Sequence, residues 1–442
     1  MSLLHNALNR RFKLEEKGAS IKTEFIGGLT TFMAMAYIIF VVPSMLGDAG
    51  MPKEAAVTAN IVITAVITLG MGLWANFPVA VAPGMGITAF FAYYVCGVMG
   101  LPWQTGLGAV FISGVLFLIL TVTRLRQMII DSVPMDMKYA IVVGIGMFIA
   151  FIGLKNCGII VASEATFVTL GDLAEPGALL ALIGVFIIGG MMARNVAGAI
   201  LIGILTVTVL GMFMGAVKVP SSLSEIASFK VPSMAPLFME MDVMAAVNYG
   251  LFSIVFTLTI VDLFDNIGTL IGLSRKAGLM DGDGRIPGLD KALITDSIGT
   301  MASACVGTTT ATTYIESAAG IAAGGRTGLT AVFTALFFLV SLIFAPLVGI
   351  VPAFATAPAL IIVGALMMQE VVHIRFSDFT IAVPAFLTII MMPLTYSIAS
   401  GFGFGFISYA LMKTLAGRRR EVSVVMWVIS LCFAVNFFLR LH

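Results

Sequence analysis

Long apolar stretches recur along almost the whole chain, and they constrain its fold more than any other feature. A helix of about 17–25 apolar residues is long enough to cross the roughly 30 Å hydrocarbon core of a bilayer. Only 11% of the 442 residues are charged, about half the share that is usual in soluble domains. The sequence therefore predicts an all-α polytopic membrane protein. The apolar stretches are 25–47, 54–75, 79–98, 103–123, 135–156, 177–193, 196–216, 244–271, 290–306, 308–323, 328–350, 355–369, 379–396, 399–415 and 423–440.

Two of these stretches, 79–98 and 308–323, lack the pattern of a continuous helix. The first opens with "PVAVAPGMG", whose prolines and glycines oppose helix formation. The second opens with "VGTTTATT", whose β-branched residues favour an extended chain. Both become compatible with a helix further along. We expect each to join an extended run to a half-helix.

Positive charge is distributed unevenly among the predicted loops. If the N-terminus is cytoplasmic and each of the first fourteen stretches crosses once, nineteen Lys and Arg residues fall on the inner side. Four fall on the outer side, namely Lys53, Lys155, Lys218 and Lys230. This is the bias that the positive-inside rule describes, and it holds only if both broken stretches cross. The sequence predicts an integral plasma (inner) membrane protein with a cytoplasmic N-terminus, while the stretch 423–440 either spans or lies in the interface.

An internal repeat relates the two halves of the chain. "TGLGAVF" (105–111) is matched by "TGLTAVF" (327–333), and "IVVGIGM" (141–147) is matched by "IIVGALM" (361–367). The two offsets, 222 and 220 residues, are nearly equal. Because each half holds seven stretches, the second half must lie inverted relative to the first. Inverted repeats of this kind are typical of secondary transporters.

An inverted repeat would bring the two broken stretches together near the middle of the bilayer. Non-helical backbone at that depth survives only where it is buried in protein or lines a wet cavity. The half-helices would then direct their positive N-terminal ends toward one cavity, which suits a polar or anionic ligand. The alternative is that both stretches are Gly-rich helices that pack closely against their neighbours.

Three acidic residues in the apolar stretches are the main candidates for function. Glu316 is predicted about one turn into the second half-helix, and Asp262 and Asp265 share one face of a helix because they are three residues apart. A buried acid costs at least about 2.5 kcal/mol at the centre of a membrane helix. No Lys or Arg lies inside the two stretches that carry these acids, 244–271 and 308–323, so salt bridges explain the acids poorly. The pattern indicates substrate or proton handling. Asn60 and Asp296, in or at the ends of the second stretch of each half, are instead expected to bond to backbone.

The motifs around these residues resemble those of purine-base permeases, in the hypoxanthine/guanine/adenine branch of the nucleobase–ascorbate transporter superfamily. The resemblance covers nearly the whole chain. The matching stretches are "TTFMAMAYIIFVVPSML" (30–46), "NFPVAVAPGMGITAFFAYY" (76–94), "VDLFDNIGTLIGL" (261–273), "TTYIESAAG" (312–320) and "GGRTGLTAV" (324–332).

The resemblance implies fourteen membrane segments in two inverted sevens, with short strands in the broken segments 3 and 10. It also implies proton symport, in which a core domain moves as an elevator against a gate domain. The implied divisions are a cytoplasmic N-terminus 1–23, the core 24–130 and 244–350, the gate 131–217 and 351–416, and a basic loop with an apolar helix 417–442.

The resemblance also assigns roles to single residues. Asp262 and Glu316 match acids that bind the purine, and Asp265 matches an acid tied to proton coupling or positioning. Thr88 stands where an asparagine is common in hypoxanthine/guanine carriers, which leaves the preferred purine open. The expected substrate-binding residues are Glu316, Asp262, Thr88, Gly86, Phe90, Ile315 and Thr313. The expected proton-coupling residues are Asp265 and Glu316.

Other functions are weaker alternatives. A uracil or xanthine permease of the same superfamily is the nearest alternative, and a channel or an intramembrane enzyme is more remote. The four cysteines are scattered without CxxC spacing, which predicts no metal site or disulfide framework. The expected partners are a purine nucleobase, a proton and the lipid bilayer, with no cofactor and no nucleic acid. A homodimer is left open.

Overall fold

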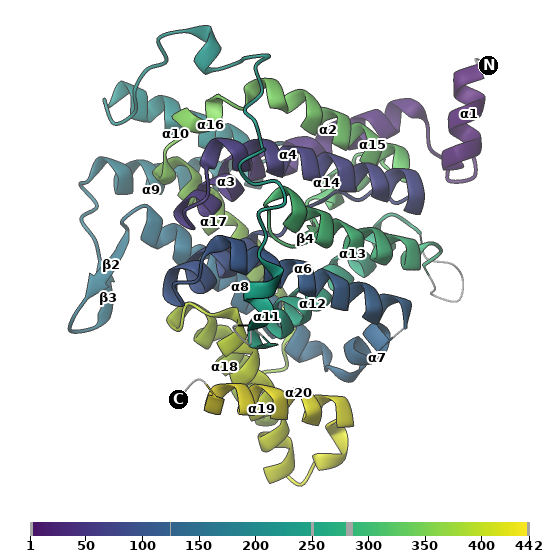
Figure 1. The fold of residues 1–442 in the computed structure, drawn as a ribbon, viewed down its shortest axis with the longest axis vertical. Coiled ribbons are helices and arrows are strands. Elements are labelled where there is room, and N and C mark those ends of the chain that lie inside the picture. Colours follow the sequence, from purple (N-terminus) through teal and green to yellow (C-terminus); the bar gives the residue numbers. More distant parts are fainter. Residues whose placement is uncertain (1–2, 124, 249–251, 280–285, 440–442) are drawn as a thin grey trace.

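The protein folds into a bundle of helices with its two termini far apart (Figure 1). The computed structural model describes residues 3–439 apart from 124, 249–251 and 280–285. The elements of the first half are α1 (Leu3–Phe12), α2 (Ile21–Met35), α3 (Ile38–Asp48), α4 (Lys53–Gly70), the π-helix η1 (Met71–Ala75), β1 (Val81–Pro83), α5 (Met85–Ala89), the π-helix η2 (Phe90–Val98), α6 (Trp103–Val122), α7 (Leu125–Ser132), α8 (Met135–Asn156), β2 (Ile160–Ser163), β3 (Phe167–Leu170), α9 (Pro176–Ala193) and α10 (Ala199–Phe213).

The second half begins with a short 3₁₀ turn and is also mostly helical. Its elements are η3 (Leu223–Glu225), α11 (Val243–Asn248), α12 (Phe252–Lys276), α13 (Leu289–Val306), β4 (Ala311–Thr313), α14 (Ser317–Ala322), α15 (Gly328–Ser341), η4 (Leu342–Phe344), α16 (Leu347–Ile350), α17 (Ala353–Met367), η5 (Met368–His373), α18 (Phe379–Leu394), α19 (Ile398–Leu415), η6 (Arg419–Glu421) and α20 (Val424–Leu439).

Several of these helices are long and apolar enough to cross a bilayer. Within the described residues, seven helices meet this length and composition, and six further apolar helices are shorter. The predicted stretches 103–123 and 135–156 agree with α6 and α8 to within a residue. The stretch 25–47 is instead interrupted between α2 and α3, where the Ile39 amide bonds three residues back to Ala36. Ala36 and Tyr37 keep right-handed helical backbone angles, so the link is one tightened turn and Ile21–Asp48 counts as one of the seven spans.

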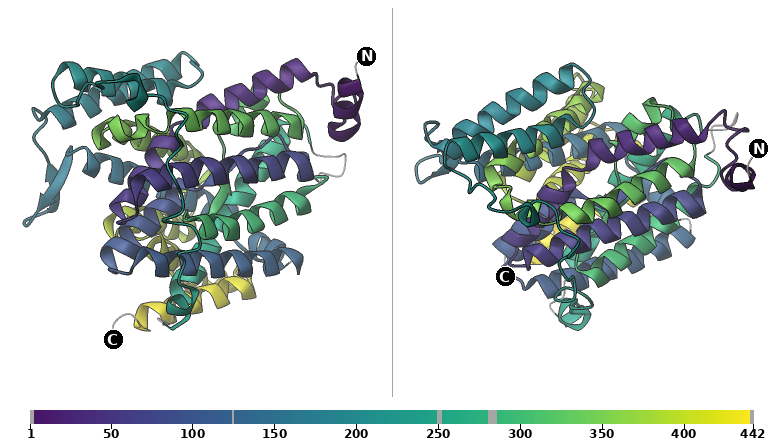
Figure 2. Two further views of the ribbon diagram at one scale, coloured as in Figure 1. Left: turned by 45° about the horizontal axis from the view of Figure 1, so that its top comes forward. Right: turned by 90° about the horizontal axis from the view of Figure 1, so that it is seen from above.

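The helices form two groups. In the strand-bearing group, α15 packs on α2 and α4, α13 packs on α6, and α12 contacts α6 and β4. In the second group, called the α8 group here, α8 packs on α17 and α18, while α9 packs on α10 and α17. Helices of the strand-bearing group run roughly side by side in both views of Figure 2. The groups meet where α5 contacts α8 and α3 contacts α17.

Two short antiparallel strands lie inside the strand-bearing group. They come from the two broken stretches, with Val81 opposite Thr313 and Pro83 opposite Ala311. Both strands are fully buried. Buried backbone must find hydrogen-bond partners, and Thr68 of α4 supplies one, because its hydroxyl bonds both the amide and the carbonyl of Val81 at 3.0 Å.

The segment 214–242 crosses the surface of the strand-bearing group after α10. Its Pro232 carbonyl accepts the hydroxyl of Thr58 at 2.9 Å, and its Met239 amide donates to the Cys305 carbonyl at 2.7 Å. This polar segment therefore contacts the first half of α4 and the end of α13. The segment ties these helices together at one end of the group.

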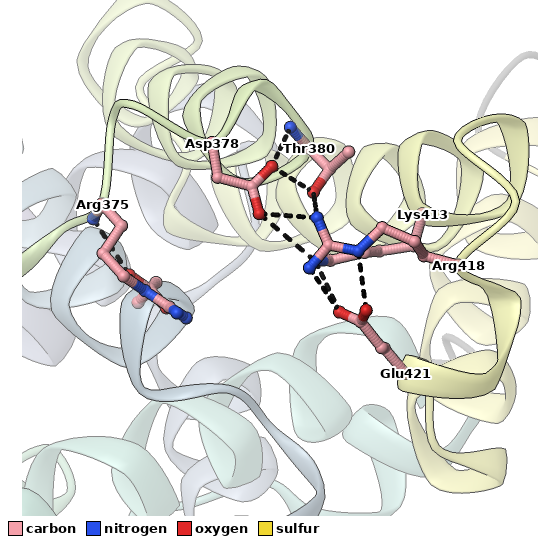
Figure 3. A network of polar contacts seen from close by, with 7 residues as sticks. Arg375, Asp378, Thr380, Lys413, Arg418 and Glu421 are labelled. Carbon is pink, nitrogen blue, oxygen red and sulfur yellow. Dashed lines mark hydrogen bonds and ion pairs between the residues drawn. The ribbon is translucent and has the colours of Figure 1, made fainter.

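An ion-pair network fixes one end of the α8 group (Figure 3). Arg418 donates to Asp378, which precedes α18, at 2.8 Å and to Glu421 at 2.6 Å. Lys413 of α19 also bonds Glu421, at 2.8 Å. Hydrogen bonds from Arg418 and Lys413 lower the pKa of Glu421 to about 2. The apolar helix α20 follows directly and packs on α19, as the rings of Phe402 and Phe433 illustrate with a centroid separation of 6.5 Å.

Candidate functional site

The candidate site is built around the strand pair and the short helices that follow it. β1 leads into α5 and β4 leads into α14, so each broken stretch combines a strand with a half-helix. The Tyr314 amide donates to the Ala80 carbonyl at 3.0 Å, which extends the pairing beyond the strands. The Ala80 amide in turn donates to the Ser317 hydroxyl at 3.0 Å. These bonds hold the start of α14 against β1.

Glu316 lies at the residue directly before α14, and not one turn inside the half-helix as predicted from the sequence. The extended run ends at Thr313, and Tyr314 to Glu316 form the turn into the helix. One carboxylate oxygen, Oε1, accepts the hydroxyl of Tyr37 at 2.6 Å. The side chain is partly exposed, and the neighbouring Ile315 is 61% exposed. Glu316 thus places an acid at an accessible position beside the strands.

Asp262 lies deeper, on α12, and only 2% of it is exposed. Its Oδ1 accepts from Nδ2 of Asn266, one turn along the helix, at 2.9 Å. The same amide nitrogen donates to Asp296 of α13 at 2.6 Å. Asn266 Oδ1 accepts from both the amide and the hydroxyl of Thr313, at 2.8 and 2.9 Å. One asparagine therefore connects two carboxylates to the strand that precedes Glu316. Asp296 thus bonds a side chain here, where the sequence predicted a backbone partner.

The remaining predicted residues of the first broken stretch are tightly packed. The hydroxyl of Thr88 bonds the Gly84 carbonyl at 2.8 Å and the Thr309 hydroxyl at 2.6 Å. Phe90 is buried and stacks on the ring of Tyr94. Gly86 is half-buried against α8, where an added Cβ would lie 2.7 Å from a methyl group of Ile145. Thr88 and Phe90 thus line the interior of the fold in this conformation.

The side chain of Asp265, predicted to act in proton coupling, lies outside the described residues. A buried cation lies near the other two acids of this region. Arg126 of α7 is 2% exposed, and both Asp262 and Asp296 attract it electrostatically. Its guanidinium stacks 3.9 Å above the ring of Phe117. The sequence did not reveal this cation, because Arg126 falls between the apolar stretches and yet folds into the interior.

Sequence reasoning also missed another buried acid, Glu24 near the start of α2. Its carboxylate accepts the amides of Arg326 and Thr330 at 2.9 and 3.0 Å, and the Thr330 hydroxyl at 2.6 Å. These groups belong to the first turn of α15 and the loop before it. A carboxylate at a helix N-terminus satisfies amides that have no partner within the helix. Glu24 is therefore a cap that joins α2 to the loop after α14.

Comparisons with known proteins agree with this architecture. A family described as "Permease family" matches residues 22–404. The transmembrane domain of the cyanobacterial bicarbonate transporter BicA has a similar fold, with a TM-score of 0.65 over 86% of this chain and 96% of that chain. Its sequence identity is 17%, so the likeness concerns the fold.

Two bacterial permeases are similar over nearly their full lengths. The adenine permease AdeQ of Escherichia coli is 44% identical, covering 98% of this chain and 96% of its own. The guanine/hypoxanthine permease PbuO of Bacillus subtilis is 43% identical, covering 97% of this chain and 100% of its own. The resemblance drawn from the motifs is confirmed, as is the prediction of a transporter and not an enzyme. This integral membrane protein belongs to the permease family.

Proposed function

We propose that this chain is a secondary transporter that imports purine nucleobases together with protons. Two similar permeases are named for adenine and for guanine and hypoxanthine. The observation that carries the proposal is the position of Glu316, a partly exposed carboxylate directly before α14 and beside the paired strands. Ring N–H groups of a purine are donors, and an ionised carboxylate is an acceptor that binds donors strongly.

The surroundings of Glu316 suit a flat, partly apolar ring. Ile315 exposes an apolar side chain directly next to the carboxylate. Ligand sites commonly combine apolar walls with a few polar groups that fix orientation. In this proposal Glu316 binds the purine directly, while Asp262 and Thr313, joined through Asn266, hold the strand and the turn that present it. Gly86 lets α5 approach α8 closely at the same place.

The proposed mechanism is alternating access in a fold of fourteen segments with inverted halves. Matching bonds in the two halves support the repeat, because Thr68 of α4 bonds β1 while Thr300 of α13 bonds the Ala311 carbonyl of β4 at 3.3 Å. The strand-bearing group corresponds to the proposed core, 24–130 and 244–350. The α8 group corresponds to the proposed gate, 131–217 and 351–416. The core would move as an elevator against the gate, with the N-terminus cytoplasmic.

The proposed role of the proton is to neutralise an acid before the core moves. Moving an uncompensated carboxylate through a low-dielectric passage is costly. Proton binding at Glu316, or at the acids of α12, would remove that cost once a purine has bound. Asp265 remains a candidate for this step because of its place beside Asp262 in the sequence.

Uptake measurements test this function directly. Radiolabelled adenine, hypoxanthine, guanine, xanthine and uracil are supplied to cells that lack their own nucleobase permeases and express this chain. We expect saturable uptake of at least one of the first three bases, and we expect a protonophore to abolish it. Uptake of only uracil or xanthine would favour the neighbouring permease class. An uptake rate that depends on a sodium gradient and not on the proton gradient would contradict symport with protons.

A further inference from the structure

The side chain of Tyr37 forms a hydrogen bond to Glu316, the proposed purine-binding acid. It lies fully buried at the turn between α2 and α3. Its hydroxyl donates to Oε1 of Glu316 at 2.6 Å across 279 positions of sequence. Within the described part of the chain, no other side chain donates to this carboxylate. Apart from this bond and one from its own backbone amide, the Glu316 carboxylate has acceptor capacity left for a ligand.

We propose that Tyr37 is the positioning residue that orients Glu316 for purine binding, an inference that rests on the proposed function. A hydrogen bond from a hydroxyl to a carboxylate is short and strong, because the acceptor is charged. Holding Oε1 restricts rotation of the carboxylate about its last torsion. The ligand then meets the carboxylate in a fixed orientation and does not lose binding energy in ordering it.

Replacing Tyr37 with phenylalanine tests this role. Tyr37→Phe keeps the ring and removes the hydroxyl, so the helices should still pack. We expect the KM for purine uptake to rise about tenfold, the usual effect of losing one charge-assisted hydrogen bond, while Vmax stays within about twofold. Tyr139→Phe is the matched control, because Tyr139 contacts His373 in the α8 group and does not touch Glu316.

A second measurement needs no purine. A water-soluble carbodiimide and an amine modify accessible carboxyl groups, and peptide mass spectrometry reports the rate at Glu316. We expect Tyr37→Phe to raise this rate several-fold, because the hydroxyl no longer occupies Oε1. An unchanged KM with an unchanged modification rate would overturn the inference. If the wild-type chain takes up no purine and the modification rate still rises, the proposed function fails while the positioning role stands.

A different set of residues joins the two helix groups at one end of the molecule. The hydroxyl of Tyr93, in η2, donates to Asp48 at the end of α3 at 2.8 Å. The same hydroxyl accepts from Nδ2 of Asn156, the last residue of α8, at 2.9 Å. Asp48 and Tyr93 belong to the strand-bearing group, and Asn156 belongs to the α8 group. One hydroxyl therefore bridges the groups.

Aromatic and cationic side chains surround this bridge. Lys155 Nζ lies 5.2 Å from the ring centroid of Tyr396 and 5.9 Å from that of Tyr93. The ring of Tyr396 meets Phe148 and Phe151 edge to face, at 5.8 and 5.7 Å. Tyr396 also has a φ of 54°, in the left-handed region. A bulky residue is strained there, so packing against the bridge must hold it in place.

We propose that Asp48, Tyr93, Asn156, Lys155 and Tyr396 form an outer latch that closes the transporter to the outside. In the proposed orientation these residues lie at the outer ends of their segments. The latch is closed here while Ile315 is 61% exposed at the candidate site. In this proposal the structure represents an inward-facing state, and the latch must open before the site can face outward.

Cysteine labelling tests the latch without reference to the transported solute. The reporter is Ile145→Cys, in a background whose four native cysteines are replaced by alanine. Ile145 is 5% exposed and lies on α8 where α5 packs against it. Tyr93→Phe breaks both bonds of the bridge and keeps the ring. We expect it to raise labelling by a membrane-impermeant maleimide, added outside, at least about fivefold, because it removes one charge-assisted and one neutral hydrogen bond.

Tyr139→Phe is the control here too, because Tyr139 lies near the start of α8 and Asn156 lies at its end. Its labelling should match that of the reporter alone. Labelling that is the same with and without Tyr93→Phe would overturn the latch, and so would an increase that Tyr139→Phe reproduces. Both results are readable even if the chain transports a solute other than a purine.

Discussion

Glu316→Gln should reduce purine uptake about 10- to 100-fold and leave the amount of folded protein in the membrane unchanged. Glutamine has nearly the same size, and its carbonyl oxygen can still accept the hydroxyl of Tyr37. The substitution removes the charge and replaces the second acceptor oxygen with a donor. Hydrogen bonds to a charged group contribute about 1.5–3 kcal/mol, and each 1.4 kcal/mol is a factor of ten in affinity. A purine N–H group facing an amide N–H group would lose its partner altogether.

Initial rates of uptake below KM, normalised to membrane-inserted protein, measure this effect. Glu164→Gln is the matched control, because Glu164 is an exposed acid between β2 and β3, on the hairpin that projects from one side of the molecule (Figure 1). It should transport at the wild-type rate. Normal uptake by Glu316→Gln would show that Glu316 does not bind the purine. A purine N–H group bound to the carboxylate would lose its acceptor when an amide NH₂ group takes that place.

The breaks in the two odd stretches could be predicted from the sequence because local chemistry sets them. Proline and consecutive β-branched residues resist helix formation whatever surrounds them, and β1 and β4 lie where these residues occur. The partners of the strands could not be predicted. Thr68 is one of many threonines in apolar helices, and nothing near it in the sequence distinguishes the one that bonds β1.

The hydrogen-bond partners of the acids Glu316 and Asp262 also could not be predicted from the sequence. The energetic cost of placing an acid in a bilayer identified Glu316 and Asp262 as candidates for function. The surroundings of each acid depend on residues far away in the chain, such as Tyr37 for Glu316. Asn266 sits four residues after Asp262, a spacing that places the two side chains together on a helix. That signal was present in "VDLFDNIGTL", and it was missed because a neutral amide carries no evident cost.

The sequence left the preferred purine open because Thr88 stands where hypoxanthine/guanine carriers commonly have an asparagine. The hydroxyl of Thr88 bonds Gly84 and Thr309, and the residue is fully buried. An asparagine at this position would be larger and would have to rearrange these contacts. An effect of Thr88 on selectivity would therefore act through the packing between α5 and the threonine run before β4. The accessible residue beside the acid is Ile315.

The packing of α2 against α14 leads to the second large prediction, that Gly320→Ala strongly destabilises the protein. A Cβ on Gly320 would lie 2.0 Å from the Thr31 hydroxyl and 2.3 Å from the Gly27 carbonyl. The second contact is with backbone, so no side-chain rotation relieves it. Overpacking a well-filled interior costs about 1–3 kcal/mol, occasionally more, and here it would separate the half-helix from the helix that leads to Tyr37.

Thermal unfolding of the detergent-purified protein measures this loss, as a lower midpoint or as failure to recover a monodisperse sample. Gly190→Ala is the matched control: Gly190 is also a helical glycine, in α9, and an added Cβ there meets no atom within 4 Å. Alanine favours a helix over glycine by about 1 kcal/mol, so the control should be neutral or slightly stabilising. If both variants unfold at the same temperature, then α14 does not pack on α2 at this distance. The close approach that fixes Glu316 beside Tyr37 would then be wrong as well.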